Sequence, residues 1–161
     1  MTRTRVVVVA ILAAASLGGW WLGQARGTAT APWTVLEVLD GDTIRVARDR
    51  AVDTVRLLGV DTPETHHPTK PVGCYGPEAS AYTAARLTGR EVVLEGDVEG
   101  RDRYGRRLAY VLVDGRRFND ELLELGYARL FVIEPNHAHA RDMLREELAA
   151  RRARAGLWGA C

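Results

Sequence analysis

The 161-residue sequence has little of three things that would point to a particular class of protein: cysteine, aromatic residues and net charge. Two cysteines cannot form the thiolate clusters typical of structural zinc sites. A formal net charge of +1 at pH 7 argues against a module that binds nucleic acid by lysine and arginine alone, because such binding depends on neutralising phosphates. Aromatic residues make up 7% of the chain, which argues against a module that binds single strands by stacking bases.

The sequence has a long hydrophobic run near its N-terminus. Basic residues precede an uncharged run from Val6 to Leu22. Its length is at the lower limit of about 17 residues for spanning a bilayer and is somewhat greater than that of most signal-peptide cores. We therefore expect residues 1–27 to form a hydrophobic helix that is either a cleaved signal peptide or a retained membrane anchor. Residues 28–31 would then be a tether to an exported domain over residues 32–161, either extracellular or held at the outer face of the cytoplasmic membrane.

Residues 32–161 are enough for one small hydrophobic core. Alternating apolar residues predict five short strands, at 34–39, 43–47, 52–60, 91–95 and 107–113. Three helices are predicted: one from Pro77 to Leu87, one capped by Asn119 and one capped by Asn136. In the last helix one apolar stripe should face the core, formed by Ala140, Met143, Leu144 and Leu148. The pattern indicates an α+β domain, a small barrel with about three α-helices attached.

Chemically suggestive residues are concentrated between residues 39 and 64. The Asp-Gly pair at 40–41 lies between two predicted strands and indicates a hairpin turn with a positive φ, which fixes Asp42 at the start of the second strand. Asp61 follows the third strand, so the turn and the strand end can bring the two carboxylates together. Oxygen ligands of this kind favour calcium, magnesium or manganese. Arg56 adds a guanidinium that can bind a phosphate with two hydrogen bonds. Together these residues predict a phosphodiester substrate held by a divalent cation.

Four sequence motifs, in this order and spacing, resemble the staphylococcal nuclease (thermonuclease) family. The motifs are Leu39–Thr43, Arg56–Thr65, Tyr75–Ala81 and Asp102–Tyr110. The resemblance extends from about Pro32 to Trp158 and implies an oligonucleotide-binding (OB) barrel with its site on the outer face, near the first three strands. It also implies a calcium-dependent nuclease that hydrolyses DNA and/or RNA and leaves 3′-phosphate products.

The resemblance further implies one calcium ion per active site. The carboxylates of Asp42 and Asp61 and the backbone carbonyl of Thr62 would bind this ion, and Asp40 would support the ion or its waters. Glu64 would be the general base, taking a proton from the attacking water or orienting it.

The resemblance assigns the phosphate contacts to a second set of residues. Arg56 and Arg106 would clamp the phosphoryl oxygens as negative charge develops. In the charged loop before the fifth strand, Tyr104 and Arg103 are expected to contact the substrate. One segment departs from the family pattern, because residues 128–135 are one residue shorter and lack a tyrosine that contacts the substrate phosphate. Either that contact is absent, or Arg129 or another residue replaces it.

Two further predictions concern partners and the cysteines. An exported chain meets oxidising conditions, so Cys74 and Cys161 are expected to form a disulfide, with two free thiols as the alternative. The expected partners are DNA and/or RNA, and the membrane if residues 1–27 are retained; a monomer is the default. The rival function is a non-catalytic nuclease-like module that binds nucleic acid or protein. Such modules lose acids or arginines from the site, whereas this chain has all five of Asp42, Asp61, Glu64, Arg56 and Arg106.

Overall fold

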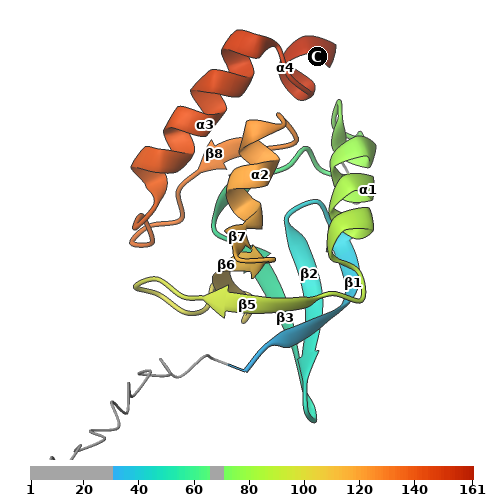
Figure 1. Ribbon diagram of the computed structural model, residues 1–161, viewed down its shortest axis with the longest axis vertical. Coiled ribbons are helices and arrows are strands. Elements are labelled where there is room, and N and C mark those ends of the chain that lie inside the picture. The colour runs from blue at the N-terminus through green and yellow to red at the C-terminus, as the bar shows by residue number, and fades with distance from the viewer. Residues whose placement is uncertain (1–30, 66–70) are drawn as a thin grey trace, which may run out of the picture.

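The structure is a computed structural model that describes residues 31–65 and 71–161 (Figure 1). Five strands form a barrel: β1 (Trp33–Asp40), β2 (Thr43–Arg48), β3 (Ala51–Leu57), β5 (Glu91–Glu95) and β6 (Arg107–Val113). They are hydrogen-bonded in the order β3-β2-β1-β5-β6, and a parallel pairing between β3 and β6 closes the barrel. The predicted α+β class and five-stranded OB-type barrel are therefore confirmed. The predicted N-terminal hydrophobic helix lies outside the described residues.

Four helices and three short strands make up the rest of the described secondary structure. The helices are α1 (Gly76–Leu87), α2 (Phe118–Glu124), α3 (Ala140–Ala153) and the short α4 (Leu157–Ala160). The short strands are β4 (Gly59–Asp61), β7 (Arg116–Arg117) and β8 (Arg129–Phe131). In Figure 1 the helices gather on one side of the barrel, with α2 between α1 and α3. Among the described residues, no helix combines the length and the apolar character needed to cross a membrane.

The core fills the barrel and continues under the helices. Barrel residues such as Ile44, Val55 and Leu57 are completely buried, as the alternation of side chains along strands requires. Phe118 of α2 and Met143 of α3 extend the same cluster beyond the barrel. The helices and the barrel thus share one core, which holds the strand ends in fixed positions.

The prediction of one strand over residues 52–60 is wrong, because the chain breaks it after β3. Gly59 has φ 73°, a left-handed conformation that glycine adopts readily, and a Cβ there would lie 2.5 Å from the end of the Met143 side chain. Beyond the break, β4 pairs with β8 in a separate antiparallel ribbon in which Asp61 lies opposite Arg129. The short strand β8 has no counterpart among the sequence predictions.

Asn119 does not cap α2, contrary to prediction. It lies inside that helix and is completely buried. Its Oδ1 accepts a hydrogen bond from the backbone N–H of Val111 at 2.8 Å, and its Nδ2 donates to the carbonyl of Leu58 at 2.8 Å. The side chain therefore supplies hydrogen bonds to backbone groups of the barrel, including the residue at the strand break.

Asn136 does not cap α3, which begins at Ala140. Its Oδ1 instead accepts a hydrogen bond from the backbone N–H of Glu99 at 2.7 Å. An asparagine can satisfy backbone groups of a distant segment as well as those of a helix end, and sequence alone does not separate the two uses.

The predicted apolar stripe of α3 is correct only in part. Met143 is buried, but Leu144 and Leu148 are 42% and 40% exposed. Glu147 takes the expected place of an apolar residue and is buried, and its carboxylate accepts a hydrogen bond from the backbone N–H of Leu130 at 3.3 Å. One face of α3 therefore holds β8 through a polar contact.

Cys74 and Cys161 form a disulfide in the structure, with their Cα atoms 6.0 Å apart and a sequence separation of 87. The bridge joins the segment before α1 to the residue that follows α4. A crosslink over so long a loop restricts the unfolded chain strongly.

We predict that Cys161→Ser lowers the free energy of unfolding by about 2–4 kcal/mol, because the unfolded chain regains the entropy of the open loop. Chemical denaturation without reductant measures this loss. The Cys74→Ser variant and the double variant should lose the same amount, since either change removes the same bond. Two free thiols in mass spectrometry of the oxidised protein, or additive losses, would contradict the pairing.

Candidate functional site

The turn between β1 and β2 places Asp42 in a buried position at the start of the second strand. Gly41 in this turn does not have a positive φ, contrary to prediction. Glycine is needed there for another reason, because a Cβ would lie 2.7 Å from Oγ1 of Thr62. The carbonyl of Gly41 accepts a hydrogen bond from the Thr83 hydroxyl of α1 at 2.8 Å, which holds the turn against the helix.

Arg56 of β3 lies at the centre of the site and is 6% exposed. Its Nη2 lies 3.1 Å from an Asp42 carboxylate oxygen and 3.1 Å from an Asp61 carboxylate oxygen. Its Nη1 donates to the carbonyls of Leu57 at 2.6 Å and Val60 at 2.7 Å. In the structure Arg56 therefore contacts both Asp42 and Asp61, although the two acids are 19 residues apart in the sequence.

The segment after β4 adds more oxygen atoms to this contact. The backbone N–H of Thr62 donates to Asp42 at 3.1 Å, while Oγ1 of Thr62 is buried and has no hydrogen-bond partner among the described residues. Oε1 of Glu64 accepts from the backbone N–H of Thr65 at 3.1 Å, and the Thr65 hydroxyl donates to Asp40 at 2.8 Å. Burial, followed by a hydrogen bond with the Glu64 carboxyl, raises the pKa of Asp40. Asp40 and Glu64 thus belong to one hydrogen-bonded group.

These side chains line one pocket of ≈ 330 Å³, which we call the polar pocket. Its lining residues are Asp40, Asp42, Thr43, Arg56, Asp61, Thr62, Pro63, Glu64 and Arg106. The structure thus brings together every residue predicted to bind the metal, act as the base or clamp the phosphate. Tyr104 and Arg103 are not part of it. Tyr104 lines a neighbouring hollow that shares Arg106 with the polar pocket, and Arg103 donates to the Tyr104 hydroxyl at 2.6 Å.

In the polar pocket, burial and neighbouring acids both disfavour the ionised form of Asp61. Desolvation by the pocket walls raises the pKa of Asp61, and the charges of Asp42 and Glu64 raise it further. Arg56 and Arg129 act in the opposite direction. Within the described ranges, no three His, Cys, Asp or Glu side chains are grouped so that they could hold a metal ion. A cation bound here would therefore need backbone or water oxygens in addition to carboxylates.

Arg106 is held by its own loop. Its Nε donates to Asp102 at 2.7 Å, and its backbone N–H donates to the other oxygen of that carboxylate at 2.9 Å. The backbone N–H of Tyr104 also donates to Asp102 at 2.9 Å. Burial by itself would raise the pKa of Asp102, but these hydrogen bonds and the charge of Arg106 outweigh it and lower the pKa. Asp102 thus fixes both the loop and the arginine that the loop presents.

Asp53 joins the same loop to the barrel. Its carboxylate on β3 accepts from Arg101 at 2.8 Å and from Arg107 at 3.0 Å. No role was predicted for Asp53 or Asp102. The order Asp-Arg-Tyr-Gly at 102–105 is typical of turns in which an aspartate accepts backbone hydrogen bonds, and that signal could have indicated Asp102. The contacts of Asp53 depend on the pairing of β3 with β6, which no local pattern indicates.

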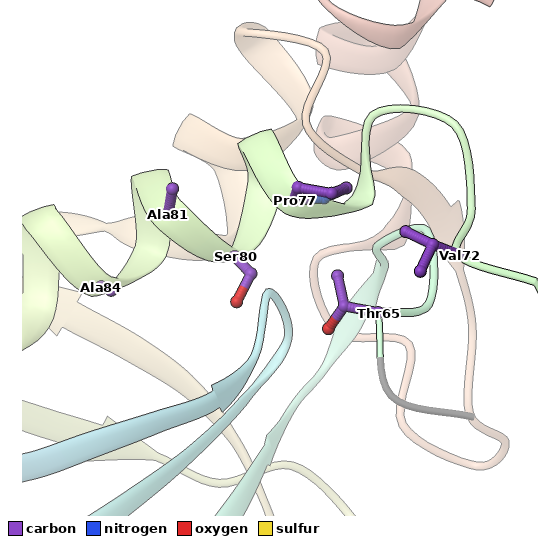
Figure 2. A pocket seen from close by; sticks show the side chains of 6 residues that line it. All are labelled: Thr65, Val72, Pro77, Ser80, Ala81 and Ala84. Atoms are coloured by element: carbon purple, nitrogen blue, oxygen red, sulfur yellow. The ribbon is translucent and has the colours of Figure 1, made fainter. Parts of the chain in front are cut away.

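A second hollow of ≈ 450 Å³ lies beside the site, between α1 and the chain on either side of residues 66–70. Figure 2 shows Thr65 and Val72 facing Pro77, Ser80, Ala81 and Ala84 of α1. None of these six described residues is charged. Thr65 links the two, because it lines this hollow and its hydroxyl donates to Asp40 of the polar pocket at 2.8 Å.

We predict that Asp102→Asn lowers the free energy of unfolding at neutral pH by about 2 kcal/mol, because the variant loses a charged acceptor and a hydrogen bond to a charged group is typically of this size. A carboxylate whose pKa is lowered on folding stabilises the protein above its unfolded pKa, near 3.8, and loses that contribution as the pH falls through the folded value. The difference between the wild type and the variant should therefore be constant at pH 6–8 and shrink below about pH 4. Denaturant unfolding at a series of pH values measures it. A difference that persists unchanged at pH 3 would contradict the ion pair.

The sequence is similar to that of known proteins over most of its length. Residues 54–160 match the family model described as staphylococcal nuclease homologue. The chain is 40% identical over 126 residues to the thermonuclease of Staphylococcus hyicus, an alignment that covers 78% of this chain and 75% of the relative. The thermonuclease of Staphylococcus intermedius is 40% identical over the same shares of both chains. Endonuclease YncB of Bacillus subtilis (strain 168) is 40% identical over 127 residues, which cover 78% of this chain and 60% of the relative.

Proposed function

Because the chain belongs to the staphylococcal nuclease family, we propose that it hydrolyses phosphodiester bonds of DNA and/or RNA in the polar pocket. The observation that carries this proposal is the contact of Arg56 with both Asp42 and Asp61, in a pocket that also contains Glu64 and Arg106. Acids and arginines in one pocket suit a reaction in which a cation and guanidinium groups meet an anionic ester.

The proposed cofactor is one calcium ion, held by Asp42, Asp61 and the backbone carbonyl of Thr62, with Asp40 supporting the ion or its waters. Three observations support the fit. All these donors are oxygens, which hard cations prefer. The carboxylates of Asp42 and Asp61 lie close enough for the charge of one to raise the pKa of the other, a repulsion that a cation would relieve. Oγ1 of Thr62 is a buried oxygen without a hydrogen-bond partner among the described residues. When bound, the ion would polarise the phosphoryl group and offset its negative charge.

Glu64 is the proposed general base. Its carboxylate takes a proton from the attacking water, or orients that water, as the water oxygen forms a bond to phosphorus. The P–O5′ bond breaks, and the 5′-oxygen leaves and is protonated from solvent, so that the products carry a 3′-phosphate and a 5′-hydroxyl. The Thr65 backbone N–H and the carboxyl of Asp40 hold the Glu64 carboxylate in place.

Arg56 and Arg106 supply the larger part of the proposed rate acceleration. General base catalysis contributes about 100- to 10,000-fold, whereas enzymes lower barriers by about 8–23 kcal/mol. Electrostatic stabilisation of the transition state must provide much of the remainder. Both arginines are already fixed, Arg56 by two carbonyls and Arg106 by Asp102, so they need little reorganisation as charge develops.

We also propose that residues 1–27 direct export, so that the nuclease acts outside the cytoplasm or from the outer face of the membrane, as a monomer. The uncharged run from Val6 to Leu22 after a basic leader supports export.

The test of the proposed function is cleavage of plasmid DNA and of RNA by the purified protein with calcium, with magnesium and with a chelator. Calcium should support cleavage and the chelator should abolish it, because the donor set is made of oxygens suited to a hard cation. Glu64→Gln, which keeps shape and hydrogen bonding but cannot accept the proton, should lower turnover at least about 100-fold. Binding of nucleic acid without any cleavage would instead favour a non-catalytic module.

Replacement of the arginines tests their assignment. Arg106→Ala should lower turnover about 100- to 1,000-fold, as expected for a lost donor to transition-state charge. Arg56→Lys keeps a charge beside Asp42 but loses the guanidinium fork, and should show a loss of similar size. Arg116→Ala, which removes an exposed arginine paired with Glu124, is the matched control and should keep full turnover. Initial rates and unfolding midpoints measure both effects, and a folded Arg106→Ala protein with wild-type turnover would refute the clamp.

A further inference from the structure

The polar pocket is the middle one of three hollows that share walls. On one side it shares Arg106 with the hollow that Tyr104 lines. On the other side it shares Asp61 and Pro63 with a hollow of ≈ 210 Å³ that we call the Arg129 hollow. The Arg129 hollow is lined by Asp61, Pro63, Gly73, Cys74, Arg129 and Cys161. A polynucleotide bound in the polar pocket can therefore reach the residues of both neighbouring hollows.

Arg129 is placed in this hollow by the fold. The antiparallel register of β4 and β8 sets it directly opposite Asp61. Its guanidinium lies over the ring of Trp158, with Cζ 5.3 Å from the ring centroid. Stacking of this kind orients a guanidinium without occupying the N–H groups at its edge.

Arg129 also differs from the arginines around it in lacking an acidic partner. Arg56 and Arg106 form ion pairs inside the site, and Arg151, which also lies over Trp158, pairs with Glu147. Within the described part of the chain, Arg129 has no Asp or Glu oxygen within 4.0 Å, although its charge still lowers the pKa of Asp61. An exposed, stacked arginine with uncommitted donors beside an anion-binding pocket suits a further phosphate.

We propose that Arg129, oriented by Trp158, binds a phosphate of the substrate next to the scissile one, and so forms a subsite on the Asp61 side of the cleavage site. This inference rests on the proposed function. The ligand is a non-scissile phosphodiester of a polynucleotide, and the subsite favours substrates that extend beyond a single linkage. A role limited to the charge balance of Asp61 would affect every substrate equally, whatever its length.

The experiment compares the wild type, Arg129→Ala and Arg129→Lys on two kinds of substrate. One is a dinucleoside monophosphate, which has only the scissile linkage. The other is a set of oligonucleotides with one cleavable linkage, in which each neighbouring linkage in turn is an uncharged methylphosphonate. Arg152→Ala, which removes an exposed arginine of α3 with no ion pair among the described residues, controls for net charge.

For the all-phosphate oligonucleotide, Arg129→Ala should lower kcat/KM about tenfold through KM, the size of one charge-assisted contact. Cleavage of the dinucleoside monophosphate should change less than about twofold, because no neighbouring phosphate is present. A methylphosphonate at one neighbouring position should lower kcat/KM of the wild type about tenfold and leave that of Arg129→Ala unchanged. Arg129→Lys should recover part of the loss.

Fluorescence anisotropy of labelled oligonucleotides bound to Glu64→Gln, with and without Arg129→Ala, tests the subsite independently of cleavage. The slope of log affinity against log salt concentration should fall by about 0.7 when Arg129 is removed, the value for one phosphate on a single strand. An inactive wild type would refute the proposed function while this binding difference still supported the subsite. The subsite would be refuted if Arg129→Ala had equal effects on both kinds of substrate. It would also be refuted if no methylphosphonate position coupled to Arg129 and the salt slope stayed unchanged.

Discussion

The site depends on how a buried guanidinium is compensated. Arg56 is inside the protein, where an unpaired charge would cost several kcal/mol, so its charge must be balanced by acceptors nearby. The break at Gly59 provides part of the answer, because the carbonyls of Leu57 and Val60 lie on either side of it and both accept from Nη1. Asp42 and Asp61 both lie 3.1 Å from Nη2. The interruption of the barrel strand is therefore a requirement of the site, and it also starts the ribbon that carries Asp61 and Arg129.

The residues around Arg56 come from separate segments, and each segment is fixed by a contact outside the site. Thr83 of α1 holds the turn before Asp42. Asn119 of α2 binds the carbonyl of Leu58 at the strand break. Asp53 ties the loop of Arg106 to β3. These contacts lie around the polar pocket and not among its own residues, so the helices and the shared core hold the side chains of the pocket in place before any ligand binds.

The sequence indicates most of the site and of the barrel, because both depend on strong local patterns. Strands β5 and β6 match the predicted bounds, since each has simple apolar alternation between turns. The predictions for Asn119 and Asn136 are wrong, because an asparagine that caps a helix and one that binds a distant backbone group look the same in sequence. The prediction for Leu144 is wrong because the sequence does not show which face of α3 packs against the rest of the domain. The predicted reason for Gly41, a positive φ, is wrong. Position 41 requires glycine because a Cβ would collide with Thr62, which lies 21 residues later in the sequence.

A net charge of +1 constrains how this domain can hold a polyanion. A general basic field is absent, and many arginines are neutralised by neighbours, as Arg101 and Arg107 are by Asp53. Under the proposed function, attraction to nucleic acid would come from the guanidinium groups whose donors face a pocket, supplemented by the proposed cation between Asp42 and Asp61. Binding of this kind would use a small number of phosphate contacts, so we expect a modest dependence on salt. The low net charge and the small number of arginines left to bind phosphate thus both follow from the pairing of many arginines with acids.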